Sequence, residues 1–160
     1  MLRQTSARSE IRVPASVHAE HEHLHGALQR ATTLVGRTGA AAAALATVLH
    51  PHFTREEEIA LPPLGLLRPL AADPDAGAEF ADVLAMTDAL AEELPRMLEE
   101  HRAIGDAIDE LARAAAMESN AEAATLARQL RFHARTEEEI LYPAAILVGE
   151  VVRARLARAR

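Results

Sequence analysis

The sequence predicts an all-α fold, an up-down-up-down four-helix bundle with an internal pseudo-twofold repeat. The composition is dominated by strong helix formers. Four long segments carry apolar residues at helical spacing, and short connections join the two segments of each pair. Helices joined in this way pack as antiparallel neighbours, and two such pairs make a bundle. Apolar residues make up 49% of the 160 positions, which is enough for one core.

The first pair of helices is expected before residue 61. An apolar stripe predicts a helix over residues 14–35, which Gly36 ends. The next helix is expected over residues 38–60, with Thr38 as its cap. Pro51 lies inside it, where a proline removes a backbone hydrogen bond and crowds the preceding turn. We therefore expect a kink or a restart there.

The second pair follows the same plan. One helix is expected over residues 78–117, with a bend near Pro95, and another over residues 121–142. Pro143 bends the latter, and a last helical segment continues towards residue 157. No stretch of the sequence has the pattern of a strand.

The composition has no break along the chain, which favours a single domain. We expect a flexible N-terminus over residues 1–12, the bundle over residues 13–150 and a basic helix end over residues 151–160. Residues 61–77 are rich in proline and glycine and form the one long connection. Because this connection is also apolar, we expect it to pack across an end of the domain.

Charge and cysteine content exclude several classes of protein. The net charge of −7 disfavours nucleic-acid binding by long-range attraction. Without cysteine there is no disulfide, thiolate nucleophile or iron–sulfur cluster, which fits a reducing compartment. The N-terminus lacks the apolar stretch of a signal peptide, and the longest apolar run is shorter than the ~20 residues of a membrane span. We therefore expect a cytoplasmic protein that binds neither nucleic acid nor membrane.

Two stretches of the chain are nearly identical. HFTREEEIALP occupies residues 52–62 and HARTEEEILYP occupies residues 133–143, so a His-x-x-x-Glu motif occurs twice, followed by an acidic cluster and a proline. A Glu-His pair precedes each motif by about one helix. Its histidine is His21, 31 positions before His52, in the first half and His101, 32 positions before His133, in the second. Two halves related by a pseudo-twofold axis would bring six side chains to the bundle centre. These are His21, His52, Glu56, His101, His133 and Glu137.

Helical geometry supports a shared centre. Residues four apart lie on one face of a helix, so His52 and Glu56 can point at the same spot, and so can the second pair. Ile59 and Ile140 are expected to continue these two stripes. The single histidine of each half lies in the middle of an apolar, core-facing stripe.

These groups favour a metal centre. One histidine on a core stripe is usually just hydrogen-bonded. Burying four histidines and two carboxylates, however, is costly without a compensating charge, which a metal supplies. The set is larger than one ion needs and suits two ions bridged by Glu56 and Glu137. Nitrogen and oxygen ligands without thiolate suit iron, manganese or zinc.

At these motifs the sequence resembles the hemerythrin-like (HHE cation-binding) domain family. EHEHL (20–24), HFTREEEIALP, EEHRAI (99–104) and HARTEEEILYP carry the resemblance, which covers residues 14–148. It implies a four-helix bundle around a non-heme di-iron centre with oxo and carboxylate bridges, with zinc or manganese as substitute metals. The ligands it implies are His21, His52, Glu56, His101, His133 and Glu137.

One departure from the family pattern concerns a fifth histidine. Oxygen-carrying hemerythrins have it four residues after the ligand of the third helix, where this chain has Gly105. Either one iron has an open or water-filled position, or another residue fills it. His25 is a candidate additional ligand, because it lies four residues after His21, at the position related to Gly105 by the repeat.

Three neighbouring side chains have lesser expected roles. Glu57 and Glu138 rotate away from the stripe, so we expect them to be solvated or to orient a metal-bound histidine. Tyr142 is expected to pack in the core rather than at the site.

The resemblance implies binding of dioxygen or hydrogen peroxide at the di-iron centre, with peroxide decomposition as a further activity. The alternative is an iron-, oxygen- or redox-sensing module without turnover, and a lesser one is a structural site for zinc or manganese. Peroxide loss over many turnovers would favour the enzyme. We expect a monomer or a homodimer.

Overall fold

The computed structural model describes residues 11–159, and every regular element within them is helical. The long helices are α1 (Ala15–Thr32), α2 (Gly36–Arg55), α4 (Val83–Met117), α5 (Ala121–Thr136) and α6 (Tyr142–Arg158). The short elements are the π-helical turns η1 (Glu56–Ala60) and η4 (Glu137–Leu141), the 3₁₀ turns η2 (Pro62–Leu66) and η3 (Ala78–Phe80), and α3 (Leu67–Ala72). Residues 1–10, most of the N-terminal segment expected to be flexible, lie outside the described residues.

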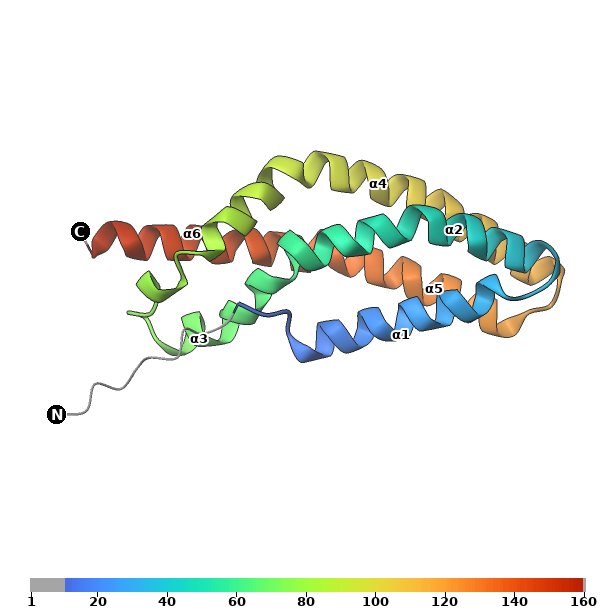
Figure 1. Cartoon of the computed structure of the whole chain (residues 1–160), viewed down its shortest axis with the longest axis horizontal. Helices are drawn as coiled ribbons and strands as arrows, with labels where there is room; N and C mark the ends of the chain where they lie inside the picture. Colours follow the sequence, from blue (N-terminus) through green and yellow to red (C-terminus); the bar gives the residue numbers. More distant parts are fainter. Residues whose placement is uncertain (1–10, 160) are drawn as a thin grey trace.

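The long helices run along the long axis of the molecule (Figure 1). α2 packs against α1 and α4, and α4 packs against α5 and α6. The α1–α2 and α4–α5 connections lie at the same end (Figure 1). Because η4 joins α5 to α6 without a break, these two form one rod, and the described chain is a bundle of four helical rods. None of the helices in this part of the chain is long and apolar enough to cross a membrane.

The helix bounds differ from the expected ones in detail. α2 runs through Pro51 without a restart, and α4 runs through Pro95. α4 changes direction within its N-terminal half (Figure 1). The helix expected over residues 121–142 divides into α5 and η4, because a π-helical turn precedes Pro143.

A residue from another helix caps the start of α2. Thr38, the expected cap, lies inside the first turn. The carboxylate of Glu118, just beyond α4, accepts hydrogen bonds from the N–H groups of Arg37 (2.7 Å) and Thr38 (3.0 Å) and from the Thr38 hydroxyl (2.6 Å). Such N–H groups have no acceptor within their own helix. The bonds lower the pKa of Glu118 and join the end of α4 to the start of α2.

The connection over residues 61–77 packs across one end of the bundle. Its side chains Leu64 and Leu70 are buried. Arg155, near the end of α6, donates hydrogen bonds to three backbone carbonyls within residues 70–76. These hydrogen bonds hold the basic end of α6 against this connection.

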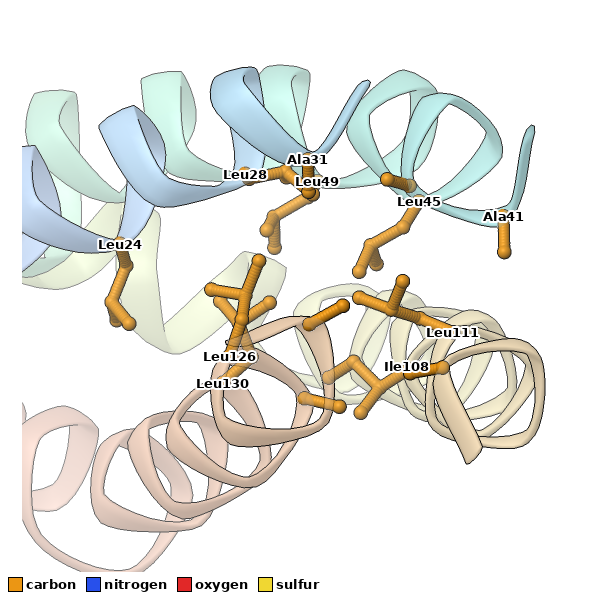
Figure 2. Packing of buried hydrophobic residues seen from close by; sticks show 14 of the residues in the cluster. Leu24, Leu28, Ala31, Ala41, Leu45, Leu49, Ile108, Leu111, Leu126 and Leu130 are labelled. Atoms are coloured by element: carbon orange, nitrogen blue, oxygen red, sulfur yellow. The ribbon is translucent and has the colours of Figure 1, made fainter. Parts of the chain in front are cut away.

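The described residues form three apolar clusters, and two of them meet in the middle of the bundle. In the first, leucines such as Leu45 on α2 and Leu111 on α4 point at one another across the bundle (Figure 2). On α4, Ile104 belongs to this cluster and Met97 to the second, and the buried His101 lies between them. The layer of ionisable side chains predicted at the bundle centre therefore lies between two apolar clusters.

Gly149 and Gly105 offer a matched pair of substitutions. A methyl group at Gly149 on α6 would lie 2.2 Å from Thr87 Oγ1 and 2.7 Å from Thr87 Cβ, whereas one at Gly105 on α4 would meet nothing within 4 Å. We expect Gly149→Ala to lower the free energy of unfolding by about 1–3 kcal/mol through overpacking. Gly105→Ala should raise it by up to about 1 kcal/mol through helix propensity. Denaturant unfolding measures both, and a Gly149→Ala variant at least as stable as the wild type would contradict the close α4–α6 contact.

Candidate metal centre

Each copy of the repeated motif leaves the α-helical geometry at its glutamate. A π-helical turn begins at Glu56 and at Glu137, and a proline follows six residues later as Pro62 or Pro143. A proline ring crowds the carbonyl group four residues before it and offers no N–H. A wider turn relieves this, and the Leu61 N–H accordingly donates to the Glu56 carbonyl at 2.9 Å. The prolines thus fix where the carboxylates stand.

The π-helical turn also changes which residues face the interior. Tyr142, five residues after Glu137, is fully buried, and so is Leu61, its counterpart in the first copy. Ile59 is buried as expected, but Ile140 is 58% exposed. The prediction for Ile140 was wrong because its surroundings differ: Ile59 packs with Leu64 of η2, whereas in the second copy the chain continues straight into α6.

The six predicted side chains are all buried and form two groups. One atom from each member lies within 4.8 Å of the others in its group. The first group takes residues from α1, α5 and η4, and the second from α2, η1 and α4. The groups are His21–His133–Glu137 and His52–Glu56–His101.

Each buried carboxylate faces both groups. Glu137 Oε1 lies 2.8 Å from His133 Nε2 and 3.3 Å from His21 Nε2, while its Oε2 lies 3.6 Å from His101 Nε2 in the other group. Glu56 mirrors this arrangement. Its Oε1 lies 3.3 Å from His52 Nε2, and its Oε2 lies 4.0 Å from His21 Nε2. One oxygen of each carboxylate is therefore available to each group.

A second ring of carboxylates faces the outer nitrogens of the imidazoles. His52 Nδ1 pairs with Glu100 at 2.9 Å and His101 Nδ1 with Glu138 at 2.8 Å. The other two contacts are longer. Glu20 lies 3.3 Å from His133 Nδ1, and Glu57 lies 3.6 Å from His21 Nδ1. Such partners direct Nε2 towards the centre and set the tautomer.

The sequence indicated only half of this ring. Glu57 and Glu138 were expected either to be solvated or to orient a histidine, and they contact histidines of their own half. Glu20 and Glu100 were missed, and each contacts a histidine of the other half. The sequence did contain a signal for them, because Glu20 directly precedes His21 and Glu100 directly precedes His101.

Tyr142 lies at the site and not only in the core. Its hydroxyl donates to Glu56 Oε1, and lies 3.1 Å from His101 Nε2 and 3.3 Å from His52 Nε2. Burial, together with the charges of Glu56 and Glu137, raises the pKa of Tyr142. The phenol is therefore held neutral beside one group only, because Leu61 occupies the equivalent place in the other half.

Burial and neighbouring charges shift the pKa values of the side chains in this layer in opposite directions. Burial lowers the pKa of His52, but hydrogen bonds and attraction from Glu56 and Glu100 outweigh it and raise the pKa to about 9. Burial and repulsion from Glu137 raise the pKa of Glu56. Burial acts in the same direction on Glu137, but its histidine partners outweigh it and lower its pKa. Burial and mutual repulsion thus oppose ionisation of both carboxylates, and added positive charge would offset this effect.

Buried polar atoms without a hydrogen-bond partner indicate whether these residues fit a metal cation. Glu56 Oε2, His21 Nδ1 and both ring nitrogens of His133 have no hydrogen-bond partner among residues 11–159. His133 Nε2 is only 2.8 Å from Glu137 Oε1, but the two groups lack hydrogen-bonding geometry. Buried polar atoms are costly without partners, and imidazole and carboxylate donors at this spacing are suitable metal ligands. The residues fit a metal-binding site.

The structure does not bring His25 into either group. Its ring instead stacks on that of His50, with 5.5 Å between the ring centroids. Gly105, its counterpart in the other half, adjoins open space.

The family model described as hemerythrin HHE cation binding domain matches residues 12–145. No curated protein and no solved structure gave a significant match.

The outer carboxylates offer a test with neighbouring controls. We expect Glu100→Gln and Glu138→Gln to weaken metal binding by roughly 10–100-fold, because each loosens an imidazole of the same group. Glu99→Gln and Glu139→Gln remove the same charge one residue away, from side chains 70% and 67% exposed, and should change little. Competition between the protein and a chelator for Co²⁺ measures the affinities. Equal losses in all four variants would show that net charge, and not imidazole orientation, is responsible.

Proposed function

Because the chain belongs to the hemerythrin HHE cation-binding domain family, we propose that it is a non-heme di-iron protein that binds dioxygen or hydrogen peroxide. We further propose that it decomposes peroxide, converting two molecules of it into one of dioxygen and two of water. The observation that carries the proposal is the position of the two buried carboxylates, each with one oxygen towards either group of histidines.

The two groups supply the ligands for two ions. His21 and His133 would hold one and His52 and His101 the other, with Glu56 and Glu137 bridging them. Nitrogen and oxygen donors without thiolate suit iron, and zinc or manganese would be substitutes. Bound iron would supply the reversible electron exchange that peroxide or dioxygen chemistry needs.

The remaining side chains prepare the site. The outer carboxylates hold each imidazole with Nε2 inwards. Tyr142 keeps a proton at its hydroxyl beside the His52–Glu56–His101 group. The apolar clusters on either side, represented by Ile104 and Met97 on α4, exclude water and strengthen every electrostatic interaction between them.

Several broader features belong to the same proposal. The four rods would run up-down-up-down, with the two halves related by a pseudo-twofold axis, as the duplicated motifs indicate. The absence of cysteine supports a reducing, cytoplasmic location. We propose a monomer or homodimer with no nucleic-acid or membrane partner.

A regulatory module without turnover is the second candidate. The observation that favours it is a set of large apolar side chains left exposed on the α5–η4–α6 rod. Phe132 is 70%, Ile140 58% and Leu147 61% exposed. A partner or second copy could cover them, and η4 links this surface to the metal centre through Glu137.

Metal content tests the centre itself. We expect about two irons per chain, since the six donors form two groups, and near-ultraviolet absorption bands of a ferric pair in the air-exposed protein. Glu56→Ala/Glu137→Ala should lose both. Glu58→Ala/Glu139→Ala, which removes exposed carboxylates of the same motifs, should keep both. One zinc per chain, or metal content unchanged by the first double variant, would refute the di-iron centre.

Turnover separates the two candidate functions. We expect the iron-loaded protein to release dioxygen from hydrogen peroxide over many turnovers, measured with an oxygen electrode, and Glu56→Ala/Glu137→Ala to be inactive. Sedimentation of metal-loaded and metal-free protein tests the alternative. Metal-dependent association without turnover would favour the regulatory module.

A further inference from the structure

A small hollow opens between α1 and α2 beside the metal centre. It measures about 180 Å³, and His21 lies at its inner wall. His21 is only 2% exposed and belongs to the His21–His133–Glu137 group. The hollow therefore reaches one of the six centre residues from outside the bundle.

Imidazoles and carboxylates line this hollow from its mouth inwards. His25 and His50 stack with an angle of 19° between their rings, and Glu22 lies beside them. His50 and Glu22 are exposed and His25 is half-buried. Glu57, whose side chain is 45% exposed, also lines the hollow, and its carboxylate lies 3.6 Å from the outer nitrogen Nδ1 of the buried His21, an atom without a hydrogen-bond partner in the described chain. Groups that bind divalent cations thus surround the hollow beside a centre residue.

A second hollow that reaches a centre residue has a different lining. It lies between α2 and α4, measures about 470 Å³ and is bordered by His52 and Glu100. The guanidinium groups of Arg55 and Arg96 also line it. Arg55 pairs with Glu58 and Arg96 pairs with Glu100, so both carboxylates that line this hollow already have a cationic partner and attract an approaching metal ion less. The hollow between α1 and α2 contains no arginine or lysine in its lining.

We propose that the hollow between α1 and α2 is the path by which a divalent metal ion reaches and leaves the centre, with His25 and His50 as transient ligands at its mouth. The inference rests on the proposed metal centre but not on any reaction there. It gives His25 a role in the rate of loading instead of a place among the resident ligands.

The test uses His25→Ala/His50→Ala in the full chain and Co²⁺ as the probe. We expect both Co²⁺ uptake, followed by stopped-flow absorbance, and Co²⁺ release to a chelator to slow by about tenfold, the lower end of the effect of a charged cleft on capture. The final cobalt content should equal that of the wild type, because a path changes both rates by the same factor. His18→Ala/His23→Ala removes two exposed imidazoles of α1 that do not line the hollow, and should load at the wild-type rate.

A second variant tests the electrostatic part of the path. Glu22→Gln should slow uptake and weaken its dependence on ionic strength. Circular dichroism should show unchanged helix content, since the altered side chains lie at the surface. Wild-type rates in both variants would overturn the inference. A lower final cobalt content in the histidine variant would also overturn it, by making His25 or His50 a resident ligand. Failure of the wild type to bind cobalt at all would instead refute the proposed centre.

Discussion

The burial of six ionisable side chains in one layer is the constraint on which this structure depends. Isolated charges in an apolar interior are costly, and the cost rises as water is excluded. The bundle nevertheless places apolar clusters on both sides of the layer. Hydrogen bonds to an outer ring of carboxylates relieve part of this cost for His52 and His101. Glu56 Oε2 and His133 Nε2 belong to the inner groups and have no hydrogen-bond partner in the described chain, and a cation within the layer would relieve the cost that remains.

Backbone geometry serves the same layer. Two prolines widen the helical turn directly after the inner carboxylates, and the turn rotates the following residues by one position. This rotation brings Tyr142 inwards, and Leu61 in the first copy. It also makes the two metal groups unequal, because the position equivalent to Tyr142 is Leu61, which offers no hydroxyl. The repeat therefore builds two similar sites with different chemical surroundings.

Much of this arrangement could be predicted from the sequence. His52 and Glu56 share a helix face by spacing alone, and duplication of the motif led to the remaining four buried residues. Periodicity failed at Ile140, because what covers this position depends on where the chain runs after the proline: into η2 in the first copy and into α6 in the second. Hydrogen bonds between different helices could not be predicted from the sequence either. Contacts such as Glu100 to His52, and Glu118 to the start of α2, depend on how the helices pack. Local patterns specify which residues turn inwards, whereas partners far apart in the chain require the tertiary structure.

The outer ring has a consequence for the ancestry of the chain. Glu100 supports His52 and Glu20 supports His133, so each half of the sequence holds a histidine of the other half in place. The inner carboxylates reach across in the same way. A chain of half this length would carry all the residue types and still leave its own site incomplete. If the repeat arose by duplication of such a chain, the ancestor would have needed a second copy of itself to complete either group.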